Sequence, residues 1–167
     1  MAGALIVAAD FGAVDFGWLE GLRRKHYPLE RNRVPVHLTI FHALPPSAET
    51  EVKSRLAEAS RRAKPKSTIA GLMNLGGGTA FRVISPELDH IREELADGFH
   101  GMLTPQDRGG WNPHITIQNK VSQKTAQELF AKLQRDFTPR LLEIHGLGLH
   151  RYLDGPWERV AAYPFRN

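Results

Sequence analysis

Two short segments of the chain carry the same side chains at the same spacing, His37-Leu38-Thr39-Ile40 and His114-Ile115-Thr116-Ile117. In a β-strand, residues two apart project from the same face, so each segment would present an imidazole and a hydroxyl opposite two buried apolar side chains. Two imidazoles that titrate near neutrality can cleave a phosphodiester without a metal, because one accepts a proton while the other donates one. The two hydroxyls could donate hydrogen bonds to phosphate oxygens, where negative charge grows in the transition state.

The repeat of this motif is hard to attribute to chance. With 8 His among 167 residues and as many Thr, a His-x-Thr triplet is expected roughly 0.4 times. Requiring an apolar residue at both flanking positions lowers the expectation to about 0.06, and two copies to a few per thousand. The alternative is a pair of structural histidines that are hydrogen-bonded within the fold, beside capping threonines.

The rest of the chain predicts elements that would position the two motifs. Apolar side chains at helical spacing predict helices over residues 14–26, 47–63, 85–103 and 122–136. The candidate N-caps are Asp10 or Asp15, Ser47 or Thr50, Ser85, and Ser122. Strands are predicted over residues 5–9, 36–44, 68–75, 79–84, 114–121, 140–150 and 157–165. Residues 27–35 and 105–113 are predicted to be the loops that lead into the two motif strands.

The order of these elements indicates an internal duplication. Strand, helix, motif strand, helix, strand occurs once up to about Leu75 and again from Thr79, with the motif at the same place in both halves. Gly76-Gly77-Gly78 lies between the halves and predicts a hairpin turn. A phosphate-binding loop is disfavoured there, because no Lys-Ser/Thr pair follows and no helix begins. Two lobes that face each other across a cleft would bring the motifs together.

The composition is that of a single soluble globular domain, with 41% apolar and 24% charged residues. The chain has no cysteine, which excludes disulfides, thiolate zinc sites and cysteine nucleophiles and favours a reducing cytoplasm. The apolar run 2–9 lacks a preceding basic segment and is predicted to be a strand, not a signal peptide, and no stretch approaches the ~20 apolar residues of a membrane span. The net charge of +4 mildly favours an anionic ligand, and the basic cluster at residues 23–26 is predicted to be a solvated helix end.

The paired motifs resemble the signature of the 2H phosphoesterase superfamily, and the 2′-5′ RNA ligase-like branch is the most similar. The resemblance covers nearly the whole chain and implies an α+β fold with pseudo-two-fold symmetry, built from a duplicated βαβαβ unit with mostly antiparallel sheets around a central cleft. One domain over residues 1–167 is expected, with lobes at approximately 1–75 and 79–167 and an exchange of terminal strands left open. Members of this family hydrolyse 2′,3′-cyclic phosphates or related cyclic phosphodiesters, and some reversibly join RNA ends through 2′-5′ linkages, without a metal.

The resemblance also implies roles for individual residues. His37 and His114 would be the acid–base pair, and Thr39 and Thr116 would hold the phosphate, with no cofactor. Family members that ligate RNA often carry a phenylalanine after the first motif and an arginine after the second. By strand alternation Phe41 shares the face of His37 and could stack on a base, while Lys120 could replace the arginine. Further candidate substrate contacts are Tyr27, Arg33 and Trp111. For Phe41 and Trp111 the alternative is a core or loop-anchor position, and for Tyr27 and Arg33 it is a solvated loop position.

Three functional classes stay open. The first is the phosphoesterase, acting as a monomer on an RNA end or a small cyclic nucleotide. The second is a nucleotide- or RNA-binding module that keeps the pocket without turnover. The third is a metal-dependent hydrolase, which is disfavoured because His37 and His42 are predicted to lie on opposite faces of one strand and no carboxylate motif completes a metal site.

Overall fold

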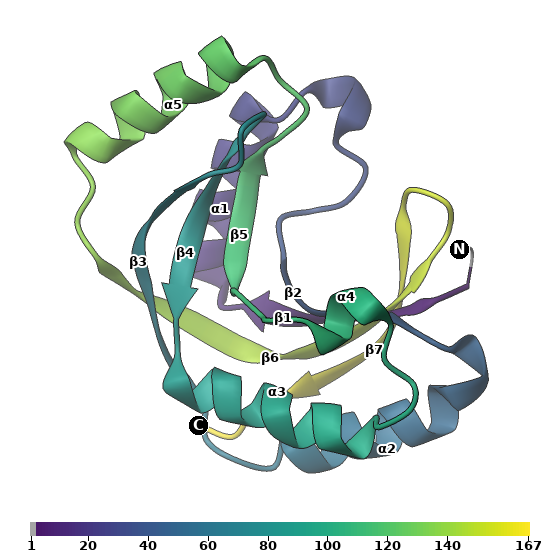
Figure 1. The fold of residues 1–167 in the computed structure, drawn as a ribbon. Helices are drawn as coiled ribbons and strands as arrows, with labels where there is room; N and C mark the ends of the chain where they lie inside the picture. Colours follow the sequence, from purple (N-terminus) through teal and green to yellow (C-terminus); the bar gives the residue numbers. More distant parts are fainter. Residues whose placement is uncertain (1–2) are drawn as a thin grey trace.

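The structure is a computed structural model that describes residues 3–167, so Ala2 in the predicted apolar run lies outside the described residues. Strands and helices are interspersed along the chain (Figure 1). The strands are β1 (Leu5–Phe11), β2 (Leu38–Leu44), β3 (Lys66–Asn74), β4 (Thr79–Ile84), β5 (His114–Gln118), β6 (Arg140–Tyr152) and β7 (Trp157–Pro164). The helices are α1 (Ala13–His26), α2 (Glu49–Ala59), α3 (Pro86–Gly98), α4 (Pro105–Arg108) and α5 (Gln123–Arg135), with 3-10 turns η1 (Leu29–Arg31) and η2 (Pro46–Ala48). The predicted α+β class is confirmed.

Helices α3 and α5 begin at their predicted N-caps, Ser85 and Ser122. The hydroxyl of Ser85 accepts a hydrogen bond from the backbone N–H of Leu88 at 3.1 Å, and Ser122 accepts one from Thr125 at 3.1 Å. The predicted side-chain caps of α1 and α2 are wrong, because these helices begin after Gly12 and Ala48 without a side-chain cap. In α2 the reason is the turn η2, which places the predicted cap Ser47 before the helix start.

Asp15 has a different task from the predicted cap. It lies in the first turn of α1 and is buried. Its carboxylate accepts hydrogen bonds from the backbone N–H of Glu143 at 2.8 Å and from Arg140 at 3.1 Å. Asp15 therefore ties α1 to β6.

The two motif strands, β2 and β5, lie at opposite ends of the sheet. The strand order is β2-β1-β6-β3-β4-β5, with β7 also paired to β6, and every pair of strands is antiparallel. Nevertheless β2 and β5 contact each other. The sheet must therefore curve strongly enough to bring its two ends together (Figure 1).

The long strand β6 connects the two parts of the sheet. Its residues 140–143 pair with β3, whereas its residues 144–151 pair with β1. The boundary predicted between residues 75 and 79 falls in the turn of the β3–β4 hairpin. Gly78 in that turn is required by packing, because a Cβ there would lie 2.0 Å from the backbone oxygen of Gln118. The glycine triplet is thus a hairpin turn, as predicted, and the structure shows in addition that it packs against the end of β5.

The apolar halves of both motifs are buried, as strand alternation predicted. Leu38, Ile40, Ile115 and Ile117 have no exposed surface and belong to one continuous core. Helix α1 packs on β5, α2 on α3, and α5 on β3 and β4.

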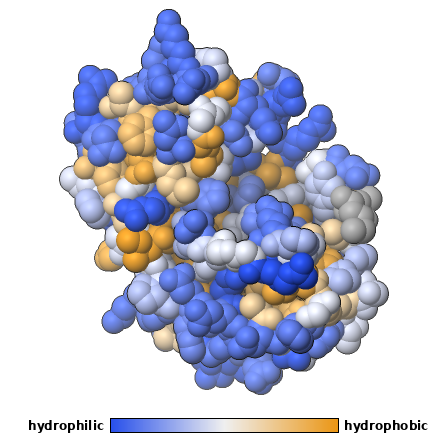
Figure 2. Space-filling model, viewed as in Figure 1, coloured by the Kyte–Doolittle hydropathy of each residue, from blue (hydrophilic) through white to orange (hydrophobic). Residues whose placement is uncertain are grey.

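Figure 2 shows mostly polar residues on this face of the molecule, with apolar residues grouped beside α5. Within residues 3–167, no helix has the length and apolar character needed to cross a membrane.

Candidate active site

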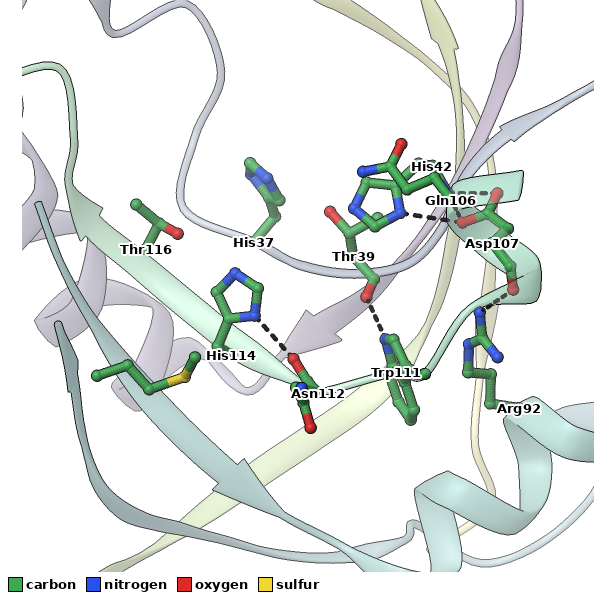
Figure 3. A pocket seen from close by; sticks show the side chains of 12 residues that line it. His37, Thr39, His42, Arg92, Gln106, Asp107, Trp111, Asn112, His114 and Thr116 are labelled. Atoms are coloured by element: carbon green, nitrogen blue, oxygen red, sulfur yellow. Dashed lines mark hydrogen bonds and ion pairs between the residues drawn. The ribbon is translucent and has the colours of Figure 1, made fainter. Parts of the chain in front are cut away.

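A cavity of about 320 Å³ lies between the two motif strands. The imidazoles and hydroxyls of both motifs line it. His114 and Thr116 belong to β5, Thr39 belongs to β2, and His37 is the residue just before β2. In Figure 3 the two imidazoles project into the space between the strands, with Thr116 on one side and Thr39 on the other. The lining residues are His37, Thr39, His42, Met73, Arg92, Gln106, Asp107, Gly110, Trp111, Asn112, His114 and Thr116.

The two motif histidines are held in the same way. Nδ1 of His37 lies 2.8 Å from the backbone oxygen of Pro35, and Nδ1 of His114 lies 2.8 Å from that of Asn112. A carbonyl oxygen only accepts hydrogen bonds, so in each ring Nδ1 must carry the proton. In the neutral ring Nε2 is then the free base. Both imidazoles are therefore fixed in the tautomer that acid–base chemistry at Nε2 requires.

His37 has an environment that favours the neutral ring. The pKa of His37 is lowered from 6.5 to about 4. Burial is the main cause, the hydrogen bond to the Pro35 carbonyl opposes it, and the charges of Arg23, His150 and His114 add to the lowering. The indole of Trp157 covers the ring, with 4.5 Å between the two ring centroids. At neutral pH the His37 ring is consequently uncharged.

The backbone next to each motif threonine is held by a side chain from another part of the chain. The indole Nε1–H of Trp111 donates to the Thr39 carbonyl at 3.1 Å. On the other strand, Nη1 of Arg23 donates to the Thr116 carbonyl at 2.9 Å. Both strands are at the ends of the sheet, where backbone groups lack a strand partner. These contacts therefore fix the position of both hydroxyls in the cavity.

Arg23 is a buried cation, not part of a solvated helix end as predicted. Only 3% of its surface is exposed, and its Nε donates to Asn32 at 2.9 Å. Its guanidinium also lies over the Tyr27 ring, with Cζ 4.2 Å from the ring centroid. Burial lowers the pKa of Arg23, but from such a high starting value that the group stays charged. Arg23 follows the buried Leu19 by one helical turn, and this spacing in the sequence indicated that both side chains share the buried face of α1.

A β-bulge in β2 places Phe41 in the core, and not on the face of His37 where strand alternation put it. Thr39 pairs with Ala8 and Phe41 with Val7, so Ile40 is an extra residue on β2. The inserted residue reverses the alternation, and Phe41 turns into the core, where it is fully buried. It packs edge-on against Phe99, with 5.4 Å between ring centroids, and cannot stack on a base in the cleft.

The same bulge brings His42 to the cavity. His42 was predicted to lie on the face opposite His37, yet both line the same space. The His42 ring is hydrogen-bonded to the carboxylate of Asp107. Asp107 belongs to α4, a short helix inside the predicted loop 105–113. The hydroxyl of Thr104 accepts from the Asp107 N–H at 3.3 Å, and Pro105 follows at the first helical position. Thr-Pro-x-Asp was therefore the signal for this helix.

Several candidate residues lie away from the cavity. Trp111 lines it, whereas Tyr27, Arg33 and Lys120 are not among its lining residues. Lys120 is exposed in a left-handed conformation (φ 62°) after β5, and the Arg33 side chain lies beside Gly155 in the turn between β6 and β7. Contacts of these three residues with a larger substrate stay predictions. Within residues 3–167, no group of three or more His, Asp or Glu side chains is arranged to hold a metal ion.

Comparisons with known proteins agree with this geometry. The family model of the 2′-5′ RNA ligase superfamily matches residues 13–156. The fold is similar to that of TT0787 of Thermus thermophilus, with a TM-score of 0.68 and 16% identity over 98% of both chains. It is also similar to that of E. coli LigT solved with 3′-AMP (TM-score 0.63, 15% identity) and to a phosphoesterase (TM-score 0.65, 17% identity), each over 100% of both chains. No curated protein sequence gave a significant match.

Proposed function

Because the chain belongs to the 2′-5′ RNA ligase superfamily, we propose that it hydrolyses a 2′,3′-cyclic phosphate or a 2′-5′ phosphodiester of RNA or a nucleotide without a metal. The observation that carries this proposal is the pair of imidazoles in one cavity, each with its Nδ1–H bound to a backbone carbonyl. This arrangement leaves two Nε2 atoms for one phosphate. The structure of E. coli LigT with 3′-AMP adds support, since a nucleoside 3′-phosphate is one product of opening a 2′,3′-cyclic phosphate.

The two histidines take different roles in the proposed hydrolysis. His37 is the base, because burial lowers its pKa to about 4 and leaves Nε2 unprotonated at neutral pH. It accepts a proton from the water that attacks phosphorus. His114, in its protonated form, gives a proton to the ribose oxygen as the bond between that oxygen and phosphorus breaks. If the 5′-hydroxyl of another RNA end attacked phosphorus in place of water and the 3′-oxygen left with the proton from the acid, the same step would join RNA ends through a 2′-5′ linkage.

The threonines stabilise the negative charge that develops on the non-bridging phosphate oxygens. The hydroxyls of Thr39 and Thr116 line the cavity with the two imidazoles. Each can donate a hydrogen bond to a non-bridging oxygen, and the backbone contacts from Trp111 and Arg23 keep both strands in place for this. The buried charge of Arg23 lies behind Thr116 and adds a favourable field for the phosphate.

Hydrolysis of adenosine 2′,3′-cyclic phosphate in excess EDTA tests the proposal. We expect turnover in the wild type and a fall of roughly 10²-fold or more in His37→Ala and in His114→Ala, with folding intact by circular dichroism. Thr39→Ala and Thr116→Ala should lose less, roughly 10-fold, because water can replace a lost hydroxyl. His100→Ala, which alters an exposed histidine after α3, is the control for loss of an imidazole elsewhere.

The other two functional classes give different results in the same assay. Binding of 3′-AMP by calorimetry without turnover would indicate a nucleotide-binding module. Turnover that disappears in EDTA and returns with added divalent cation would indicate a metal-dependent hydrolase. Rates near that of the wild type in both histidine variants would contradict the assignment of the acid–base pair.

A further inference from the structure

A third imidazole lies at the α4 end of the cavity, outside the two motifs (Figure 3). Nδ1 of His42 lies 3.0 Å from Oδ1 of Asp107. An ionised carboxylate only accepts, so Nδ1 carries a proton and Nε2 is the atom left for a ligand. When Nε2 also carries a proton, it donates to an anion and the ring is a cation. The side chain of His42 is 41% exposed, whereas that of Asp107 is completely buried. The acid is therefore the support and the imidazole is the exposed group.

The Asp107 carboxylate is buried and anchored by backbone hydrogen bonds, unlike the acid of a surface ion pair. Its carboxylate also accepts hydrogen bonds from the backbone N–H groups of His42, at 2.9 Å and 3.0 Å, and of Ala43, at 3.1 Å. Burial raises the pKa of Asp107, but these hydrogen bonds outweigh the effect and hold the pKa below its usual value. The carboxylate thus stays charged and fixes both the bulged backbone and the His42 ring.

A permanent cation lies beside this pair. Arg92 donates from Nε to the carbonyl of Ile40 at 3.1 Å and from Nη2 to that of Asp107 at 2.8 Å. Its guanidinium lies over the rings of Phe41 and Trp111, with Cζ 4.7 Å and 5.2 Å from their centroids. Arg92 lines the cavity, and the hydrogen bonds it makes to the described residues use Nε and Nη2. Nη1 is therefore the guanidinium atom that can bind a ligand.

We propose that His42 and Arg92, with Asp107 as the positioning residue, form a second anion-binding subsite that takes a second phosphate of the substrate. His42 is three residues beyond Thr39 on one strand, so the two subsites are at most roughly 10 Å apart along it. A separation within this limit suits two phosphates of one nucleotide or of neighbouring nucleotides. The inference rests on the proposed function and narrows its substrate to nucleotides or RNA ends that carry another phosphate beside the reacting one.

Two probes separate the subsites without turnover, adenosine 3′-monophosphate and adenosine 3′,5′-bisphosphate. By isothermal titration calorimetry we expect the wild-type protein to bind the bisphosphate roughly 10-fold more tightly than the monophosphate. His42→Gln should bring the ratio of the two dissociation constants close to one, and Asp107→Asn should lower it by roughly 3-fold. His100→Gln is the matched control and should keep the wild-type ratio.

Each result supports or overturns a separate part of the inference. Monophosphate binding with no gain from the second phosphate, or an unchanged ratio in His42→Gln, would overturn the subsite and leave the proposed function standing. Absence of any binding of the monophosphate, together with absence of turnover, would overturn both. If His42 and Asp107 only tie α4 to β2, both variants should unfold at lower temperature while the ratio stays at the wild-type value.

Discussion

Protonation of His37 should destabilise the folded protein in mildly acidic solution. The unfolded chain takes up this proton as the pH falls through 6.5, whereas burial delays uptake in the folded state to about pH 4. Between these values the unfolded state binds more protons, so the free energy of unfolding decreases as the pH falls, and the loss is complete below about pH 4. A change of one pKa unit corresponds to about 1.4 kcal/mol, so the shift from 6.5 to about 4 gives a total loss of about 3.5 kcal/mol.

The variant His37→Asn isolates this effect. The asparagine Nδ2 can replace Nδ1 as the donor to the Pro35 carbonyl, but it does not titrate. Urea denaturation of both proteins between pH 7.5 and pH 4.5 gives the difference in their free energies of unfolding. We expect that difference to shift against the wild type by about 2.5 kcal/mol over this range. Other groups that titrate in this range are present in both proteins and cancel.

Proton NMR provides an independent readout of the same ring. The His37 Cε1–H resonance should titrate with a midpoint near 4 in the folded wild type, because burial lowers its pKa to that value. A midpoint near 6.5, or an unfolding difference that stays flat from pH 7.5 to pH 4.5, would refute the reasoning and remove the basis for assigning His37 as the base.

Three further substitutions test the surroundings of the motifs. Phe41→Ala should destabilise the protein by about 3–5 kcal/mol in urea denaturation, while Phe41→Leu should leave KM for a cyclic nucleotide unchanged, since the ring is in the core. Trp111→Phe removes the donor to the Thr39 carbonyl and should lower stability by about 1 kcal/mol and kcat/KM several-fold. Arg23→Met should raise the pKa of His37 in an NMR titration, because the charge of Arg23 lowers it; an unchanged midpoint would contradict that cause.

The sequence by itself determined the motif faces and the class of fold. Leu38 and Ile115 are fully buried and the motif side chains line one cavity, because alternation along a strand depends only on local geometry. The caps at Ser85 and Ser122 were predictable for the same reason, since each serine bonds to an N–H three residues later. The duplicated motif also indicated two strands that face each other.

Only the tertiary structure decided which other residues join the site. The unpaired Ile40 reverses the alternation of β2, which sends Phe41 into the core and His42 to the cavity. The contacts that hold this arrangement join segments far apart in sequence, as between His42 and Asp107 or between Arg23 and Thr116. Local periodicity carries no information about such contacts, because they arise only when the curved sheet brings its two ends together and their unpaired backbone groups find side-chain partners.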